Sequence, residues 1–192
     1  MTIYLIGDSI RLHAEFYIRQ ALAPLTVASP PENCRSSDIL AEHIAEWAPA
    51  KSGDIVHLNC GLHDIRHNTG SDQPVNSLAQ YQANLRRIFD YLAARRSRVI
   101  WATSTPFNQI VHNTVKASHR YDEDIMRYNA CSVELATAYG FAVNDLHAVL
   151  TSAGYESLLQ SDGLHYTEAG SRLIGETIAR AIRLQAERPA RS

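Results

Sequence analysis

The regular alternation of short apolar segments with longer amphipathic segments constrains the fold of this chain more than any other feature. Residues 2–6, 25–28, 54–59, 98–103 and 141–143 have the composition of buried strands. Apolar residues recur at helical spacing in residues 11–23, 37–47, 77–95, 121–139 and 167–185. Consecutive parallel strands need a right-handed crossover, which is usually a helix. The alternation therefore predicts an α/β fold in which a five-stranded parallel sheet carries helices on both faces.

The length of the chain and its lack of internal repeats predict a single domain. The chain has 192 residues, and a chain of that size buries roughly 70% of the surface that its unfolded form exposes. No disulfide or structural metal is needed to stabilise such a core. We expect one domain over residues 1–186, followed by a loose tail over residues 187–192.

The charge balance argues against polyanionic partners. Lys and Arg together number 18, Asp and Glu together number 20, and the formal net charge is −2. The cationic residues are scattered, so we expect neither a nucleic acid nor an anionic membrane as partner. The apolar runs are strand-sized and far below the roughly 20 residues that span a bilayer. A small molecule is the expected ligand, and the pattern makes no prediction of oligomeric state.

The cysteines and the start of the chain predict a cytoplasmic protein. Cys34, Cys60 and Cys131 are an odd number of cysteines at no metal-ligand spacing, which favours a reducing compartment. The first residues carry no basic leader and their apolar run is short, so they do not read as a secretory signal.

Polar residues follow the predicted strands at the positions where parallel sheets bind ligands. Gly7-Asp8-Ser9-Ile10 follows the first strand, Gly61-Leu62-His63-Asp64 follows the third, and Asp162-Gly163-Leu164-His165 precedes the last helix. A serine, a histidine and a carboxylate are what acyl transfer needs: a nucleophile, a base and a group that orients the base. Each block alone has a structural explanation, since a Gly-Asp-Ser after a strand commonly caps a helix.

Together, and in this order, the three blocks resemble those of the GDSL or SGNH hydrolase family, and the resemblance spans essentially the whole chain. It implies a three-layer α/β/α fold like that of flavodoxin and an ester hydrolase that needs no cofactor. On this resemblance Ser9 is the nucleophile, His165 the general base and Asp162 the carboxylate that orients the base.

The middle blocks depart from the family pattern at the residues that would bind the oxyanion. Cys34 stands where the family has a glycine whose amide contributes, and His63 stands where the family has an asparagine. We expect the oxyanion to lie between the amides of Ser9 and Cys34 and a side-chain donor. Imidazole can donate from one ring nitrogen, so His63 could keep that role, or Asn33 or Asn59 could replace it.

The remaining polar residues of these blocks are interpreted as structural support. Asp8, Gly61 and Asp64 are expected to shape the loops, since aspartate side chains readily accept backbone amides in turns. A metal site is the alternative, because imidazole and carboxylate suit zinc or iron. We expect no metal, since the buried strand aims one histidine away from the loop and none of these residues has metalloprotease spacing. The residues in question are His57, His63, Asp64 and His67.

The function expected from these residues is hydrolysis of a short acyl ester, with an acetyl ester of a polar alcohol such as a carbohydrate as first choice. Residues 108–120 are expected to form a polar lid or substrate loop. A lysophospholipase or thioesterase is the second choice, and metal-dependent phosphoester chemistry is third. A binding protein that kept the fold without the chemistry is the alternative from a different class.

Overall fold

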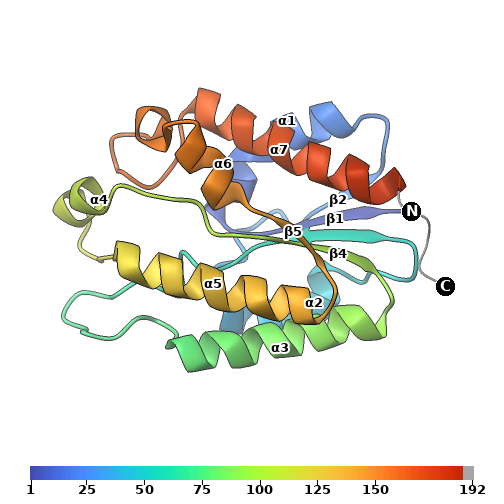
Figure 1. Ribbon diagram of the computed structural model, residues 1–192, viewed down its shortest axis with the longest axis horizontal. Helices are drawn as coiled ribbons and strands as arrows, with labels where there is room; N and C mark the ends of the chain where they lie inside the picture. Colours follow the sequence, from blue (N-terminus) through green and yellow to red (C-terminus); the bar gives the residue numbers. More distant parts are fainter. Residues whose placement is uncertain (188–192) are drawn as a thin grey trace.

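Five parallel strands form one sheet, as the alternation predicts, in a computed structural model that describes residues 1–187 (Figure 1). The order along the sheet is β2-β1-β3-β4-β5, which is the flavodoxin-like order. The first strand, β1, pairs with two neighbours, so that Ile3 lies opposite both Val27 and Ile55. The strands are β1 (Ile3–Ile6), β2 (Val27–Ala28), β3 (Ile55–Leu58), β4 (Arg98–Ala102) and β5 (Ala142–Asn144).

Helices cover both faces of the sheet and complete the predicted α/β/α arrangement (Figure 1). One layer contains α1 (Ser9–Leu22), α6 (Leu146–Ser152) and α7 (Glu168–Glu187), with α1 packed along α7. The opposite layer contains α2 (Ser37–Trp47), α3 (Leu78–Ala94) and α5 (Asp122–Ala138). Two short helices, α4 (Gln109–Val115) and the 3-10 helix η1 (Tyr155–Leu158), lie in the connections. No helix in the described part of the chain is long and apolar enough to cross a membrane.

The core consists of apolar residues on both faces of the sheet, which is what a parallel sheet covered on both sides requires. All four residues of β3 are buried, including one histidine, His57. The Nε2 atom of His57 lies 3.1 Å from the side-chain amide of Asn144 on β5. Burial lowers the pKa of His57 to about 4, so its imidazole is neutral at pH 7.

Local capping explains where several helices begin. Ser77 and Gln80 form a reciprocal capping box at the start of α3, within one residue of the predicted start. Asp8 caps α1 by accepting from the amide of Ile10 at 3.0 Å, so the helix begins at Ser9 instead of the predicted residue 11. Asn108 caps α4 by accepting from the amide of Val111.

The structure corrects three expectations about irregular segments. Residues 108–120 are not simply a polar loop, because they contain α4. The helices α6 and η1 were not expected, and like α4 they span only seven residues or fewer, too short for a periodic pattern to stand out. Ala186 and Glu187, expected at or beside the start of the loose tail, are the last residues of α7. Residues 188–192 of that tail lie outside the described residues.

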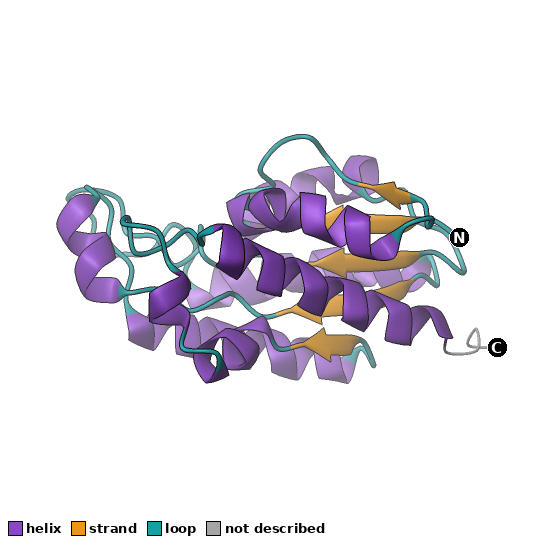
Figure 2. Ribbon diagram, turned by 90° about the horizontal axis from the view of Figure 1, so that it is seen from above, coloured by secondary structure: helices purple, strands orange, loops and turns teal. Residues whose placement is uncertain are grey.

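All five strands point toward the same end of the molecule, where long loops gather (Figure 2). Ser9 follows β1, and β1 lies between β2 and β3 in the sheet. The loop after β2 and the loop after β3 therefore flank the start of α1. This arrangement brings the blocks singled out in the sequence to one edge of the sheet.

Candidate active site

Ser9, His165 and Asp162 form a continuous chain of hydrogen bonds. The Oγ atom of Ser9 lies 3.0 Å from Nε2 of His165, although the two residues are 156 positions apart. On the other side of the ring, Nδ1 of His165 lies 2.7 Å from Oδ2 of Asp162. When Nδ1 donates to the carboxylate, Nε2 is left to accept from the serine hydroxyl. The structure thus brings together the three residues that the sequence predicted as a catalytic set.

The Asp162 carboxylate is held by a tight turn of four residues. Its Oδ1 accepts from the amides of Leu164 at 3.0 Å and His165 at 2.9 Å. Burial by itself would raise the pKa of Asp162, but the hydrogen bonds from the ring and amide of His165 and from Leu164 lower it well below its usual value. Gly163 has φ 69°, and a Cβ there would lie 2.9 Å from the backbone nitrogen of His112. The turn therefore needs glycine at this position.

The start of α1 presents Ser9 at the edge of the sheet. Ser9 is the first residue of the helix, where a backbone N–H has no partner within the helix. Asp8 is buried and fixes the first turn through Oδ1, whereas its Oδ2 is buried without a hydrogen-bond partner. Gly7 admits the side chain of Asn59, whose Oδ1 would lie 2.2 Å from a Cβ at residue 7. Asn59 thus packs against the turn that carries Ser9.

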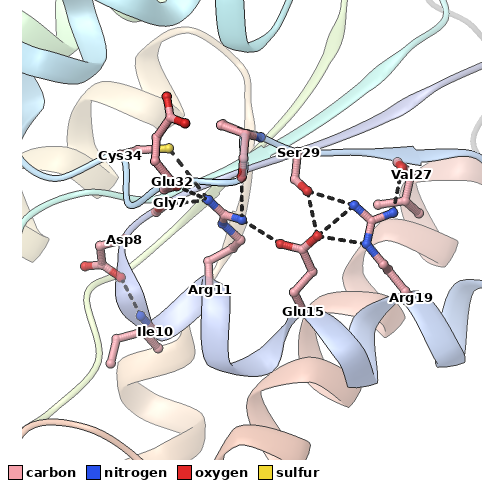
Figure 3. Close-up of polar contacts among 11 residues, drawn as sticks. Gly7, Asp8, Ile10, Arg11, Glu15, Arg19, Val27, Ser29, Glu32 and Cys34 are labelled. Atoms are coloured by element: carbon pink, nitrogen blue, oxygen red, sulfur yellow. Dashed lines mark hydrogen bonds and ion pairs between the residues drawn. The ribbon is translucent and has the colours of Figure 1, made fainter.

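A buried arginine, Arg11, attaches the loop after β2 to the start of α1 (Figure 3). Its guanidinium donates to the backbone oxygens of Pro30 at 3.0 Å, Glu32 at 2.8 Å and Gly7 at 3.4 Å. Glu15, one turn further along α1, lies 2.5 Å from Nη1 of Arg11 and balances its charge. The sequence analysis missed Arg11, because an arginine on an amphipathic helix ordinarily lies on the solvated face.

Cys34 does not take the place in the oxyanion site that the sequence analysis gave it. Its amide donates to the backbone oxygen of Gly7 at 3.1 Å, and its side chain is fully buried. An amide already committed to a carbonyl is not free to donate to a substrate oxygen. The next residue, Arg35, has φ 56° and so adopts the left-handed conformation that glycine prefers. The glycine-like position of this loop is therefore Arg35, one residue beyond the predicted one.

Two side-chain donors, Asn33 and His63, meet beside the start of α1. Asn33 Nδ2 lies 3.5 Å from His63 Nε2, while Asn33 Oδ1 accepts from the amide of Arg35 at 2.8 Å. Burial lowers the pKa of His63, and the arginines around it lower that pKa further against the opposing charge of Asp8. The His63 ring is therefore neutral at pH 7 and offers one N–H donor.

Asp64 anchors the loop that carries His63. Its carboxylate accepts from the amide and hydroxyl of Ser37 and, at 2.8 Å, from the side-chain amide of Asn76. Burial raises the pKa of Asp64 to about 6, although these hydrogen bonds act in the opposite direction. Gly61 has φ 148°, and a Cβ there would meet Ser104 Oγ at 2.3 Å. Both residues thus shape the loop.

The residues considered for a metal site lie apart. His57 is in the sheet with Asn144, and the Asp64 carboxylate is engaged by Ser37 at the start of α2 and by Asn76. Nε2 of His67 lies 3.1 Å from Asp124 Oδ2 on α5. Among residues 1–187, no group of three or more His, Cys, Asp or Glu side chains is arranged to hold a metal ion.

A second buried arginine, Arg120, joins the two sides of the site, and the sequence analysis did not identify it. Its Nε donates to the backbone oxygen of Leu62 at 2.7 Å, and its Nη1 lies 2.7 Å from His112 Nε2. The Nδ1 of His112 lies 3.4 Å from the backbone oxygen of Asp162. Burial and the charge of Arg120 lower the pKa of His112 to about 4, so this histidine accepts from the arginine. No sequence pattern marks such a bridge.

Comparison with known proteins gives a family and a set of structural neighbours. The model of the GDSL-like lipase/acylhydrolase family matches residues 18–173, a range that includes Asp162 and His165 and begins after Ser9. A search of curated proteins found no sequence match.

Three solved structures share the fold at low sequence identity. A lipase/acylhydrolase from Enterococcus faecalis is 18% identical, with TM-score 0.75 over 100% of this chain and 98% of that chain. The acetyl xylan esterase AlAXEase is 17% identical, with TM-score 0.70 over 95% of this chain and 100% of that chain. A variant of an acetyl-xylooligosaccharide esterase from Geobacillus is 17% identical, with TM-score 0.71 over 100% of this chain and 96% of that chain.

Proposed function

Because the chain belongs to the GDSL-like lipase/acylhydrolase family, we propose that it hydrolyses carboxylic esters with Ser9 as nucleophile, His165 as general base and Asp162 as the orienting carboxylate. The observation that carries this assignment is the hydrogen-bonded chain from Ser9 Oγ through the His165 ring to Asp162, with distances of 3.0 and 2.7 Å. These are the contacts that a serine nucleophile and its base require.

The reaction follows from the direction of these hydrogen bonds. Ser9 Oγ attacks the ester carbonyl carbon while His165 Nε2 takes the hydroxyl proton, and Asp162 stabilises the resulting imidazolium. The tetrahedral intermediate collapses as Nε2 returns the proton to the leaving alkoxide, which leaves as the alcohol. Water then attacks the acyl-Ser9 ester with the same base, and the carboxylic acid and free Ser9 result.

The oxyanion of the intermediate would lie at the start of α1, between Ser9 and the Asn33–His63 pair. The Ser9 amide supplies one donor, because it opens the helix. Asn33 Nδ2 supplies a second donor. The side-chain oxygen of Asn33 accepts from the Arg35 amide, so the nitrogen is the end of the side chain that faces the site. The neutral His63 ring, whose Nε2 lies 3.5 Å from Asn33 Nδ2, is the alternative side-chain donor. The amide of Cys34 is bonded to Gly7 and is no part of this set of donors.

Acetyl esters of a polar alcohol such as a carbohydrate are the proposed substrates. Two structural neighbours are described as an acetyl xylan esterase and an acetyl-xylooligosaccharide esterase, each 17% identical to this chain. The mouth of the candidate site also carries the polar side chains of Asn33, His63 and His13, and the ring centre of His13 lies 5.2 Å from that of His165. Such a mouth favours a polar alcohol and a short acyl group.

A lysophospholipase or thioesterase is the second candidate, and α4 is the observation that favours it. Ile110 and Val115 on this helix are 79% and 55% exposed, and α4 packs against the Asp162–His165 turn. Exposed apolar side chains beside a candidate site suit a longer acyl chain.

Labelling and an acyl-chain series test the proposal together. A fluorophosphonate should modify one residue, Ser9, and abolish hydrolysis of 4-nitrophenyl acetate. Ser9→Ala should lose the label, whereas Ser71→Ala, an exposed loop serine, should keep it. A label on another residue of an active protein contradicts the assignment. Preference for octanoate over acetate selects the lipase-like candidate, and inertness to every ester favours a binding protein.

We also propose a cytoplasmic location. Cys34, Cys60 and Cys131 are all free thiols in the structure, which suits a reducing compartment. Cell fractionation with an antibody against the protein tests this, and recovery from an extracytoplasmic fraction contradicts it.

A further inference from the structure

A pocket of about 420 Å3 lies beside His63, and its charged lining has no role in the chemistry described above. It is formed by the loop after β2, the loop after β3 and the first turn of α2. These two strands flank β1, whose following residues carry Ser9. The pocket therefore adjoins the proposed oxyanion donors. Its lining residues are Arg35, Ser36, Asp38, Ile39, His63 and Arg66.

Within the described residues, the two arginines that line the pocket have no carboxylate partner. Among residues 1–187, neither the Arg35 nor the Arg66 guanidinium makes a hydrogen bond or an ion pair within 4.0 Å. The Nε atom of Arg66 is buried without a partner. Asp38 also lines the pocket, but its Oδ1 accepts from Asn76 Nδ2 at 2.8 Å. The residues that line the pocket thus carry two guanidinium groups and one carboxylate, so the lining has a net positive charge.

The backbone of Arg35 adopts an unusual conformation, which is independent of the charges in the pocket. Arg35 has φ 56°, in the left-handed region that is unfavourable for residues other than glycine. A glycine here would relieve the strain and leave the loop as it is. An arginine held in a strained conformation at the mouth of a pocket points to a use for its side chain.

The surroundings of the pocket add to its positive potential. Arg120 lies behind His63, is 4% exposed and has no acidic partner within 4.0 Å among residues 1–187. Burial and the neighbouring charge of Arg66 lower the pKa of Arg120 to about 10, so it stays charged at neutral pH. A buried positive charge of this kind is compensated when an anion binds beside it.

We propose that the ester substrate carries a carboxylate, which Arg66 and Arg35 bind in this pocket. The inference rests on the proposed esterase function and deepens it, because it assigns an acidic ester to the same site. Guanidinium is suited to this recognition, since its planar fork pairs with both carboxylate oxygens. The carboxylate is carried by either the alcohol or the acyl part of the ester, and the experiment has an arm for each.

Matched pairs of acidic and neutral esters measure the preference of the enzyme for a substrate with a carboxylate. The alcohol arm compares 4-acetoxybenzoate with its methyl ester, and the acyl arm compares 4-nitrophenyl hemisuccinate with 4-nitrophenyl pentanoate. The quantity of interest is the ratio of kcat/KM for the acidic and neutral members, compared between wild type and variants, because intrinsic reactivity cancels. In one arm Arg66→Gln should lower this ratio roughly 10- to 100-fold, mainly through KM. Hydrolysis of the neutral ester should change far less than hydrolysis of the acidic ester.

Three further variants separate binding from general effects. Arg35→Gly should lower the ratio while the thermal midpoint stays equal or rises, because glycine relieves the backbone strain. Asp38→Asn should raise the ratio, since it removes the carboxylate that lines the pocket and repels the ligand. Arg87→Gln, on the exposed face of α3, removes the same charge as Arg66→Gln and should leave the ratio unchanged. An unaltered ratio in Arg66→Gln in both arms overturns the proposal.

A binding measurement keeps this inference separate from the esterase assignment. Ser9→Ala protein is titrated calorimetrically with 4-acetoxybenzoate, 4-nitrophenyl hemisuccinate and the two neutral counterparts. Tighter binding of an acidic ester, lost when Arg66→Gln is added, supports the pocket even if wild type hydrolyses no ester and the esterase proposal fails. Equal binding of acidic and neutral esters overturns the pocket even if hydrolysis of neutral esters proceeds through Ser9.

Discussion

The two sides of the candidate site are built in different ways. The His165 side is a turn of four residues, in which Asp162 accepts two amides and one imidazole within three positions of sequence. The opposite side joins two loops that are distant in sequence, with Asn33 meeting His63 and Arg11 bracing the loop after β2. The first side is local and rigid, and it matches the family blocks. The second depends on tertiary contacts, and there this chain departs from the family.

The difference teaches where chemistry and specificity reside in this molecule. The local turn holds the base and its orienting carboxylate through hydrogen bonds that close over three or four residues, and α4 packs against it. The loop side can change its residues while keeping its backbone, because Arg11 and Asp64 anchor the loops from beneath. We therefore expect mutations on the turn side to abolish turnover, and mutations on the loop side to reduce it in part.

The largest expected effect is on the turn side. His165→Ala and Ser9→Ala should each lower kcat by about 10^4-fold or more, since the nucleophile and its base act as a unit. Asp162→Asn should cost somewhat less, because a misoriented imidazole can still sample the productive tautomer. Steady-state kinetics with 4-nitrophenyl acetate measure these losses. Thermal midpoints close to that of wild type serve as the control, and a variant with near-normal kcat would remove its residue from the proposed mechanism.

The loop side should show an intermediate effect that identifies the oxyanion donor. If His63 donates in the transition state, His63→Ala should lower kcat roughly 100-fold with little change in KM, and His63→Asn should recover part of the loss. If Asn33 is the donor, Asn33→Ala should carry that penalty and His63→Ala should mainly change stability. Measuring kcat and thermal midpoint for both variants decides between them. An unchanged kcat in both would place the side-chain donor elsewhere.

Arg11, which holds the loop after β2, should contribute to the free energy of unfolding. Arg11→Met removes a buried guanidinium that holds three backbone oxygens, and we expect a loss of about 3 kcal/mol or more in the free energy of unfolding. Arg19→Met is the matched control, because Arg19 pairs with the same Glu15 from the exposed face (Figure 3). It should cost only about 0–1 kcal/mol. Urea unfolding measures both, and equal losses would contradict the role given to Arg11.

The smallest expected effect is a difference in acid sensitivity between the sides. His112, behind the turn, has a folded pKa of about 4, whereas an unfolded histidine titrates near ~6.5. The unfolded chain therefore binds this proton first, and the free energy of unfolding falls as pH falls from about 6.5 to about 4. Asp64, beneath the loop side, has a folded pKa of about 6 against ~3.9 when unfolded. The folded chain therefore binds the Asp64 proton first, so this group makes the free energy of unfolding rise as pH falls from about 6 to about 4.

Substitutions separate these two contributions. Thermal midpoints measured between pH 4 and pH 7 should fall less steeply with acid in His112→Gln than in wild type. They should fall more steeply in Asp64→Asn, because the opposing contribution is gone. Parallel curves for wild type and His112→Gln would show that His112 does not titrate as described.

Much of the fold could be predicted because its signals are local. The apolar strands and the long amphipathic helices show their burial in the spacing of neighbouring residues, as in α3. Three segments escaped prediction for the same reason, since α4, α6 and η1 span seven residues or fewer and are too short for a helical period to show. The start of α1 was misplaced by two residues, because Asp8 and not a later residue is its cap.

By itself the sequence determined the alternation of elements, the Asp162–His165 turn and the position of Ser9 after the first strand, because each depends on residues close together in the chain. The tertiary structure decided what these residues meet. It brought Ser9 to 3.0 Å from His165 across 156 positions, engaged the Cys34 amide with Gly7, and gathered Arg35, Arg66 and Arg120 around His63. Those contacts depend on the order in which the strands pair, and no spacing within a single segment carries that information.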